Sequence, residues 1–226
     1  MTTTGTTSFS MDFTEIAEEA WERAGRDMRS GYDLRTARRS MNLMLIEWQN
    51  KGINMWTIEE GTLPLVQGTA TYTLPADTID LMEHVIRTGS GSSQQDISIS
   101  RISVSTYSSI PNKESQGRPI QLWINRLAAA PTVTVWPVPE SGNYTLQYWR
   151  MRRIEDTGAG VETPDMTFRF LPVLVAGLAY HIAMKIPDLA PRIDMLKVIY
   201  DEQFHMAASE DREKATLSLL PRVARL

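Results

Sequence analysis

Residues 33–75 read DLRTARRSMNLMLIEWQNKGINMWTIEEGTLPLVQGTATYTLP, and the periodicity of this stretch changes near Trp56. Before Trp56, apolar residues recur at spacings of three and four, which is typical of one face of an amphipathic helix. After it, short runs of β-branched and apolar residues are separated by turn signals such as Gln67-Gly68. The stretch therefore joins a helical segment to a strand-rich one.

Helical patterns lie on both sides of the strand-rich region and predict two helical hairpins. Each helix carries an apolar stripe, and most have a capping signal at one end. Pro172 falls inside the third helical pattern, so it lies in the first turn or kinks the helix. The four helices are predicted at residues 13–24 with a capping box of Asp12 and Glu15, from an Asp33 cap to Asn50, from Thr167 to Ile186, and from an Asp188 cap to Asp211.

Seven strand-like runs lie between residues 57 and 153, and one of them covers residues 96–102. Runs this short and closely spaced predict an antiparallel sandwich or barrel, with a helical turn at residues 103–109. Gly158-Ala159-Gly160 is interpreted as a flexible joint. The predicted fold class is α+β: a four-helix bundle from N- and C-terminal helical hairpins, with an inserted antiparallel β-sandwich or barrel and an extended C-terminal arm. The predicted boundaries are 1–11 for a flexible N-terminal arm, 12–56 and 163–211 for the helical bundle domain, 57–157 for the antiparallel β domain, and 212–226 for the C-terminal arm.

Composition excludes several classes of function. The 226 residues include 23 basic and 27 acidic ones, so a net charge of −4 argues against a general nucleic-acid coat. Cysteine is absent, which removes disulfides, thiolate metal sites and cysteine nucleophiles. The longest apolar stretch, residues 171–184, is shorter than the roughly 20 residues of a membrane-spanning helix. The N-terminus lacks the basic and apolar regions of a signal peptide.

Catalytic signals are weak. None of the three histidines lies three or four residues from another, and no G-x-S-x-G or phosphate-loop motif occurs. His181 is interpreted as a core or interface histidine. The acidic groups at Glu59-Glu60 and along the first helix are interpreted as solvated surface rather than as catalytic pairs or metal ligands. We therefore predict a protein that is not an enzyme, with no catalytic, cofactor-binding or metal-binding residue and no cofactor.

Basic clusters are more informative. Three arginines fall on one side of the second helix, and three more end the last strand, at positions 150, 152 and 153. Surface salt bridging explains such clusters, and docking onto an acidic neighbouring subunit is the sharper alternative. Tryptophans such as Trp56 belong to the core or anchor an interface. The predicted subunit-interface residues are Arg35, Arg38, Arg39 and Trp56.

One pattern resembles a known family. A helix with an Arg-rich start is followed by E-W-x-N-x-G-x-N-x-W and then by a strand ending G-x-x-x-Y-x-L-P. The run FRFLPVLVAGLAYHIAMKIP is similar to that family as well. The family is the head-to-tail adaptor of short-tailed bacteriophages, also called tail tubular protein A or head-completion protein. The residues that carry the resemblance are Glu47, Trp48, Asn50, Gly52, Asn54, Trp56, Gly68, Tyr72, Leu74 and Pro75.

The resemblance implies a virion structural protein at the head–tail junction. Members form a ring, usually of twelve copies, that joins the portal to the tail nozzle, seals packaged DNA and forms part of the DNA ejection channel. The implied partners are the portal protein, the tail nozzle protein and identical subunits, with transient passage of double-stranded DNA and no membrane. Heterologous contacts repeated around a closed rotation produce such a ring.

The resemblance also implies a role for the basic and apolar C-terminal arm, which is expected to reach into the portal. Two alternatives remain open: a tail-tube or nozzle subunit, and a carbohydrate-binding or carbohydrate-active module built on the β region. The predicted portal-binding residues are Arg212, Lys214, Leu217, Leu219, Leu220, Arg222 and Arg225.

Overall fold

The computed structural model describes residues 3–7, 9–53 and 55–211, and the chain divides into two compact units. One unit runs through Trp56 and resumes at Glu155, and the other is Thr57–Ile154. The first is helical and the second is built of strands, so the α+β class predicted from the sequence is confirmed. Within the ranges described, no helix is both long and apolar enough to span a membrane.

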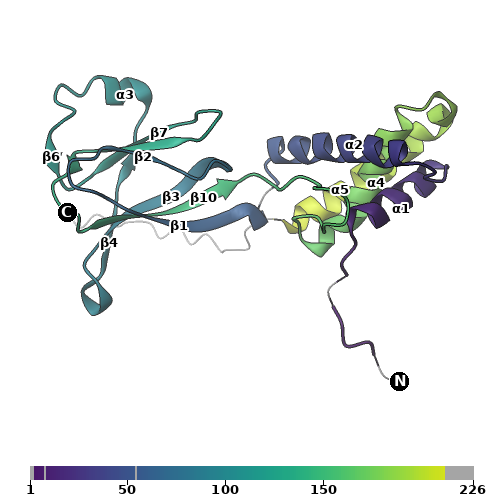
Figure 1. Cartoon of the computed structure of the whole chain (residues 1–226), viewed down its shortest axis with the longest axis horizontal. Coiled ribbons are helices and arrows are strands. Elements are labelled where there is room, and N and C mark those ends of the chain that lie inside the picture. The colour runs from purple at the N-terminus through teal and green to yellow at the C-terminus, as the bar shows by residue number, and fades with distance from the viewer. Residues whose placement is uncertain (1–2, 8, 54, 212–226) are drawn as a thin grey trace, which may run out of the picture. The chain divides into compact units, whose positions relative to one another are not determined.

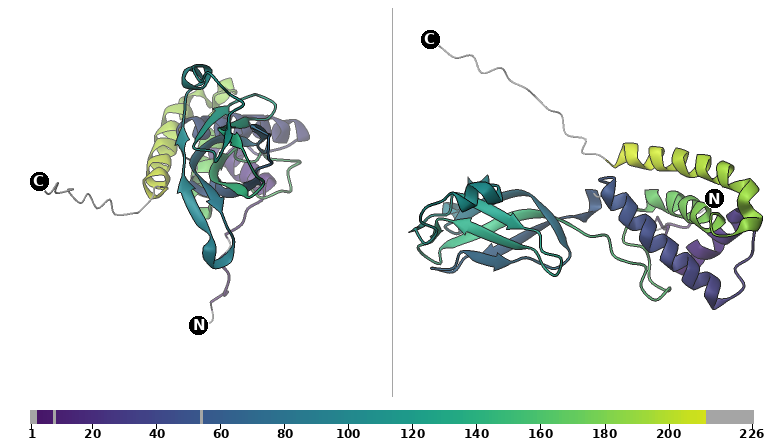
Figure 2. Two further views of the ribbon diagram at one scale, coloured as in Figure 1. Left: turned by 90° about the vertical axis from the view of Figure 1, so that its left-hand side faces the viewer. Right: turned by 90° about the horizontal axis from the view of Figure 1, so that it is seen from above.

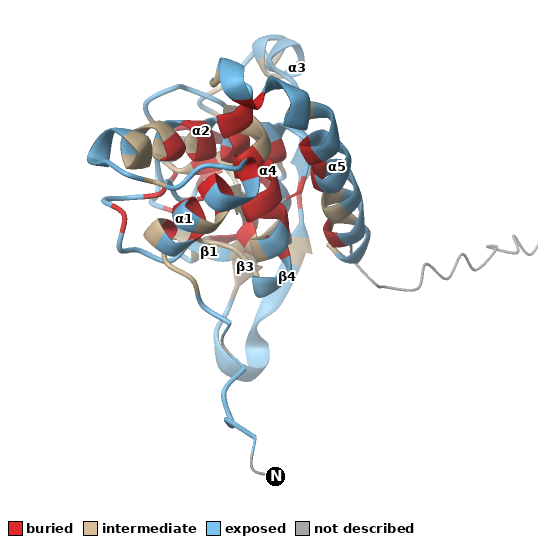
Figure 3. Ribbon diagram, turned by 90° about the vertical axis from the view of Figure 1, so that its right-hand side faces the viewer, coloured by how far each residue is buried: buried red, intermediate tan, exposed pale blue. Residues whose placement is uncertain are grey.

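The helical unit is organised around α4, which contacts each of the other three long helices. Its residues are apolar on nearly every side, and nine of them are buried. Figure 3 shows this buried helix in red, with α1, α2 and α5 packed around it. The right-hand panel of Figure 2 shows α5 running alongside α4. The long helices are α1 (Phe13–Ala24), α2 (Gly31–Asn50), α4 (Leu171–Ala183) and α5 (Ile193–Glu210) (Figure 1).

The start of α1 has the predicted capping box. The Asp12 carboxylate accepts the Glu15 N–H at 2.8 Å, and the Glu15 carboxylate accepts the Asp12 N–H at 3.0 Å. The start of α2 differs from the prediction, because Ser30 rather than Asp33 is the N-cap. The Ser30 hydroxyl accepts the Asp33 N–H, which places Asp33 in the first turn near the positive end of the helix dipole.

The last helix also begins differently from the prediction. Asp188 does not cap an α-helix, because it lies in a 3₁₀-helix, η4 (Pro187–Arg192), and α5 starts after that segment without a side-chain cap. The prolines at positions 187 and 191 lack an N–H, which suits a short turn with few backbone bonds. Pro172 lies in the first turn of α4, where its missing N–H costs nothing.

The strand unit contains two four-stranded sheets and a two-stranded one. The predicted helical turn at 103–109 is present as α3 (Val104–Ser108). The first sheet has the order β1 (Ile58–Pro64), β10 (Tyr144–Arg152), β3 (Thr78–Thr88), β4 (Gln95–Ser98). The second has the order β2 (Thr71–Thr73), β8 (Thr132–Trp136), β7 (Gln121–Asn125), β5 (Ser100–Arg101), and β6 (Gln116–Gly117) pairs with β9 (Val138–Pro139).

Both four-stranded sheets contribute to one hydrophobic core, and in the described part of the chain neither closes into a barrel. Residues 96–102, predicted as one strand, divide at Ile99 between β4 of the first sheet and β5 of the second. The Ile99 side chain is buried in the shared core, so this residue marks the point where the chain changes sheets. The predicted pairing was antiparallel, but β5–β7 and β6–β9 are parallel. The connection through α3 permits the first, since parallel neighbours need a crossover.

The chain enters and leaves the strand unit on neighbouring strands. β1 and β10 pair antiparallel from Ile58 opposite Met151 to Pro64 opposite Thr145. Because β1 and β10 are neighbours, the first and last residues of the strand unit lie close together. The strand unit can therefore be inserted into the helical unit without a segment that crosses its hydrophobic core.

The segment predicted as a flexible joint, residues 158–160, is a hydrogen-bonded turn of the helical unit. The Glu162 carboxylate accepts the N–H groups of Ala159, Gly160 and Val161 at 2.8–3.1 Å. These bonds lower the pKa of Glu162. Positive φ angles at Gly158 and Gly160 allow the backbone to wrap around the carboxylate.

Candidate interaction surfaces

The predicted interface arginines of α2 have different environments. Arg35 and Arg39 are exposed on the outward side of the helix, where Tyr32, Arg35, Arg38 and Arg39 line a shallow cleft of about 260 Å³. Arg38 points to the turn described above, and its Nη1 donates to the Gly158 carbonyl at 3.0 Å. Arg38 therefore stabilises the helical unit, while Arg35 and Arg39 remain accessible to a partner.

A larger cleft of about 610 Å³ lies between α1, α2 and the end of α4. Its lining carries three basic side chains, Arg26, Arg39 and Lys185, and one acidic one, Asp33. Burial and the nearby Arg39 charge both lower the pKa of Lys185, whose Nζ donates to the Ser40 hydroxyl at 2.6 Å. The positive charge of this cleft suits an acidic protein segment.

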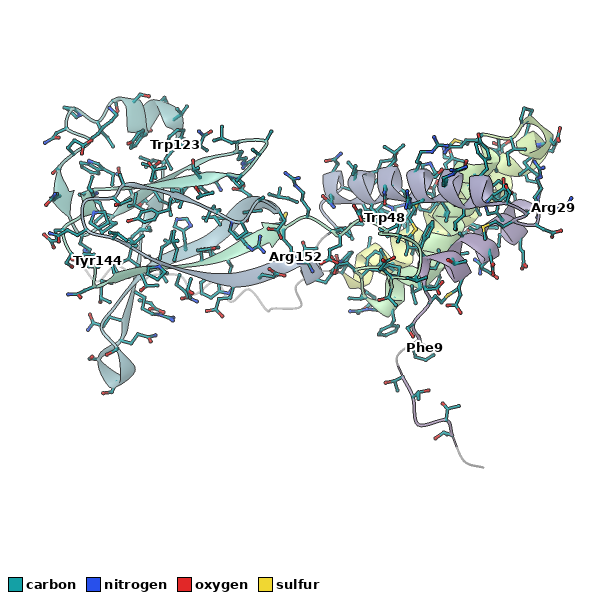
Figure 4. The ribbon with its side chains drawn as sticks, in the orientation of Figure 1. Phe9, Arg29, Trp48, Trp123, Tyr144 and Arg152 are labelled. Atoms are coloured by element: carbon teal, nitrogen blue, oxygen red, sulfur yellow. The ribbon has the colours of Figure 1, made fainter. Side chains whose placement is uncertain are left out.

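Trp56, the fourth predicted interface residue, makes contacts inside its own unit. Its Nε1–H donates to the Asp165 carbonyl at 2.9 Å, and its ring lies 4.9 Å from that of Phe170. Trp48, labelled in Figure 4, is fully buried and donates to the Tyr200 hydroxyl at 2.8 Å. The assignment of Trp56 to a subunit interface stays a prediction.

The seven predicted portal-binding residues, from Arg212 to Arg225, lie outside the described residues. Their role stays a prediction.

The arginines that end β10 form ion pairs within the strand unit. Arg150 bonds both Asp77, at 2.6 Å, and Glu59, at 2.9 Å, and Arg152 bonds Glu59 at 2.6 Å. The Arg150 hydrogen bond lowers the pKa of Asp77. The β1–β10 pairing brings Glu59 opposite Arg150, which is why these charges meet. For Arg150 and Arg152, this cluster is therefore explained by salt bridges within the strand unit.

The glutamates considered for catalysis form ion pairs or hydrogen bonds, and two of the histidines have lowered pKa values. Glu59 pairs with arginines, and the Glu60 carboxylate accepts a hydrogen bond from Gln147. Burial lowers the pKa of His84 and of His181, so both rings are uncharged at neutral pH. Among the described residues, no group of three His, Asp or Glu side chains could hold a metal ion.

Sequence reasoning missed the exposed apolar side chains on the outer sides of α2 and α5. Leu43 and Ile46 on α2 are 61% and 53% exposed. On α5, Met195, Val198 and Met206 are about half exposed, and Ile199 is 38% exposed. The signal was present as apolar pairs three residues apart outside the buried stripe, Leu43 with Ile46 on α2 and Met195 with Val198 on α5.

Exposed apolar and basic helix faces are typical of a protein that acts by binding other proteins. The family model described as SU10 adaptor protein matches residues 11–222, and the chain belongs to this family of bacteriophage head–tail adaptors. No curated protein matches the chain significantly. The chain is therefore a structural adaptor of the virion's head–tail region, a role that requires binding to other head or tail proteins.

Proposed function

We propose that this chain forms a ring that joins the portal to the tail nozzle, seals the packaged DNA and lines part of the channel through which the DNA is ejected. The observation that carries the proposal is the family match, which spans residues 11–222 of 226. The proposed ring number is twelve, the usual number that the resemblance implies. The net charge of −4 agrees with passage of DNA, since a strongly basic lumen would bind the phosphates.

The architecture proposed for this role is a four-helix bundle that carries the ring contacts and a β-sandwich inserted in it. The packing of three helices on α4 supports the first part, and the core shared by two sheets supports the second. The C-terminal arm, residues 212–226, docks on the portal through its basic and leucine side chains.

Quantitative mass spectrometry of purified virus particles tests the proposed ring. We expect this chain to be present in parity with the portal protein, at twelve copies in the proposed assembly. A much larger number would indicate a tail-tube subunit instead. Absence from the particle would overturn the structural role.

Deletion of residues 212–226 tests the proposed arm. We expect the truncated chain to lose binding to purified portal while keeping its melting temperature. A second variant, with the four basic residues of the arm replaced by Ser, should weaken binding in a salt-dependent manner. Unchanged portal binding by the truncated chain would contradict the proposed arm contact.

A further inference from the structure

The outer sides of α2 and α5 carry complementary side chains. The α2 face consists of Arg35, Arg39, Leu43 and Ile46, and every one of these residues is exposed. Its first half is basic and its second half apolar. Within the described part of the chain, Arg35 has no ion-pair or hydrogen-bond partner, and Arg39 reaches only the Thr36 hydroxyl, at 3.4 Å.

The α5 face consists of Met195, Val198, Glu202 and Met206, all exposed as well. It combines apolar side chains with a carboxylate that has no partner among the residues described. Beside it, Asp194 and Asp201 add two negative charges and Lys197 one positive charge. The α5 face is therefore apolar and acidic, where the α2 face is apolar and basic.

The spacing on the two faces matches when the helices run antiparallel. From Arg39, the chain advances four residues to Leu43 and seven to Ile46. From Glu202, it goes back four residues to Val198 and seven to Met195. Both sets cover about 10.5 Å along a helix axis, at about 1.5 Å per residue. With Arg39 opposite Glu202, Leu43 faces Val198 and Ile46 faces Met195, while Arg35 lies opposite Met206.

The two faces do not meet each other inside one chain. α2 and α5 contact each other through buried side chains such as Trp48 and Tyr200, whereas every residue of the two faces is exposed. A contact between two different faces of one molecule is heterologous, and repetition of such a contact produces a ring or a filament.

We propose that the α2 face of one copy packs antiparallel on the α5 face of a second copy, with Arg39 paired to Glu202 of the neighbour. This inference rests on the proposed ring and specifies which helices form its subunit contact. The occupant is a second copy of this chain because the second face of the same molecule supplies the complementary charge and the matching apolar spacing.

Charge reversal tests the contact. We expect wild-type protein to self-associate in sedimentation velocity, and Arg39→Glu or Glu202→Arg alone to weaken association by at least about tenfold. The double variant R39E/E202R should recover association, because the exchanged charges at positions 39 and 202 of neighbouring copies are again opposite in sign. Arg29→Glu, an exposed charge outside both faces, is the matched control and should behave as wild type. Melting temperatures establish that every variant is folded.

Disulfide trapping gives a second readout, since the chain has no cysteine of its own. Under mild oxidation, L43C/V198C should form a ladder of linked copies that ends in one closed species. L43C alone should not form a ladder beyond dimers, because one cysteine per copy can link only two copies.

Three results would overturn the inference: a monomeric wild type at every concentration, failure of the charge-swapped pair to recover, or absence of the disulfide ladder. The particle measurement described above separates this failure from failure of the ring. If the chain and the portal protein are present in equal copy number but Arg39→Glu does not change self-association, the adaptor function stands and this subunit contact is rejected. Loss of binding to another virion protein, without loss of self-association, would assign the α2 face to that partner instead.

Discussion

Gly177 lies where α4 passes close to both α2 and α5. A Cβ atom there would lie 2.5 Å from the Met44 sulfur and 2.8 Å from the Tyr200 ring, and both neighbours are buried. We expect Gly177→Ala to lower the free energy of unfolding by about 1 kcal/mol. An overpacking cost of about 1–3 kcal/mol exceeds the gain of about 1 kcal/mol in helix propensity. Chemical denaturation of the full chain measures the change.

Gly31→Ala is the matched control, because a Cβ at Gly31 in the first turn of α2 meets no atom within 4 Å. This variant should be neutral or slightly stabilising. A Gly177→Ala protein as stable as Gly31→Ala would show that α4 can move away from its neighbours without cost.

His181 makes the stability of the helical unit depend on pH. Burial lowers its pKa below the ordinary value of 6.5, and the charge of Glu47 opposes that effect while those of Lys185 and Lys51 add to it. The unfolded chain therefore binds more protons than the folded chain once the pH falls through about 6.5, so stability falls with acidification in that range. We expect the melting temperature of His181→Gln to fall less than that of wild type between pH 7.5 and pH 5.5. These two pH values lie about one unit above and below the histidine pKa in the unfolded chain.

His205, which is exposed on α5, provides the control for this experiment. His205→Gln should keep the wild-type dependence of melting temperature on pH. If His181→Gln and wild type lose the same amount on acidification, another group controls the effect.

At the scale of the element, pairing of β1 with β10 is stabilised by charge as well as by backbone bonds. The Arg150 side chain is 12% exposed and bonds carboxylates on both sides of its strand. We expect Arg150→Met to lower the free energy of unfolding of the strand unit by about 1–3 kcal/mol, since hydrogen bonds to charged groups contribute about that much. We expect a loss toward the lower end of this range, because the Glu59 and Asp77 carboxylates are nearly half exposed and water screens their charges.

The same variant has a predicted dependence on pH. Because Arg150 lowers the pKa of Asp77 in the folded state, the stabilisation is present above the ordinary value of 3.8 and is lost as the pH falls through the lowered pKa. The difference between wild type and Arg150→Met should therefore shrink in acid. Arg118→Met, an exposed arginine of the same unit, should change stability little at either pH.

At the scale of the whole molecule, we expect residues 57–154 to fold as a separate fragment. Their hydrophobic core consists of residues of this unit, and the first and last strands pair with each other at the cut ends. Circular dichroism and a cooperative thermal transition of the isolated fragment measure this. A fragment without a cooperative transition would show that the strand unit depends on the rest of the chain.

Local pattern determined the order of elements. The apolar spacing on α1 and α4, the capping box at Asp12 and the alternating strand residues are short-range signals, and they predicted helices and strands close to those observed. These signals gave the wrong helix start where a neighbouring residue competed for the same position. Ser30, and not Asp33, is the N-cap of α2. The prolines on either side of Asp188 favour a 3₁₀-helix before α5.

The candidate surfaces depended more on the tertiary structure. The sequence predicted accessible arginines on α2, but only packing separates Arg38, which bonds the Gly158 carbonyl, from Arg35 and Arg39 on the outside. Similarly, Trp56 donates its N–H within its own unit. A periodic pattern identifies two apolar stripes on α5 and does not state which of them meets α4.

The amino-acid sequence by itself determined the α+β class, the order of helices and strands, and membership of the adaptor family, because all three rest on residue types at fixed spacings along the chain. Only the tertiary structure decided the change of sheet at Ile99, the parallel pairs, the ion pairs of Arg150 and the exposed faces of α2 and α5. These features join residues far apart in sequence, and which of those residues meet depends on how all the elements pack together.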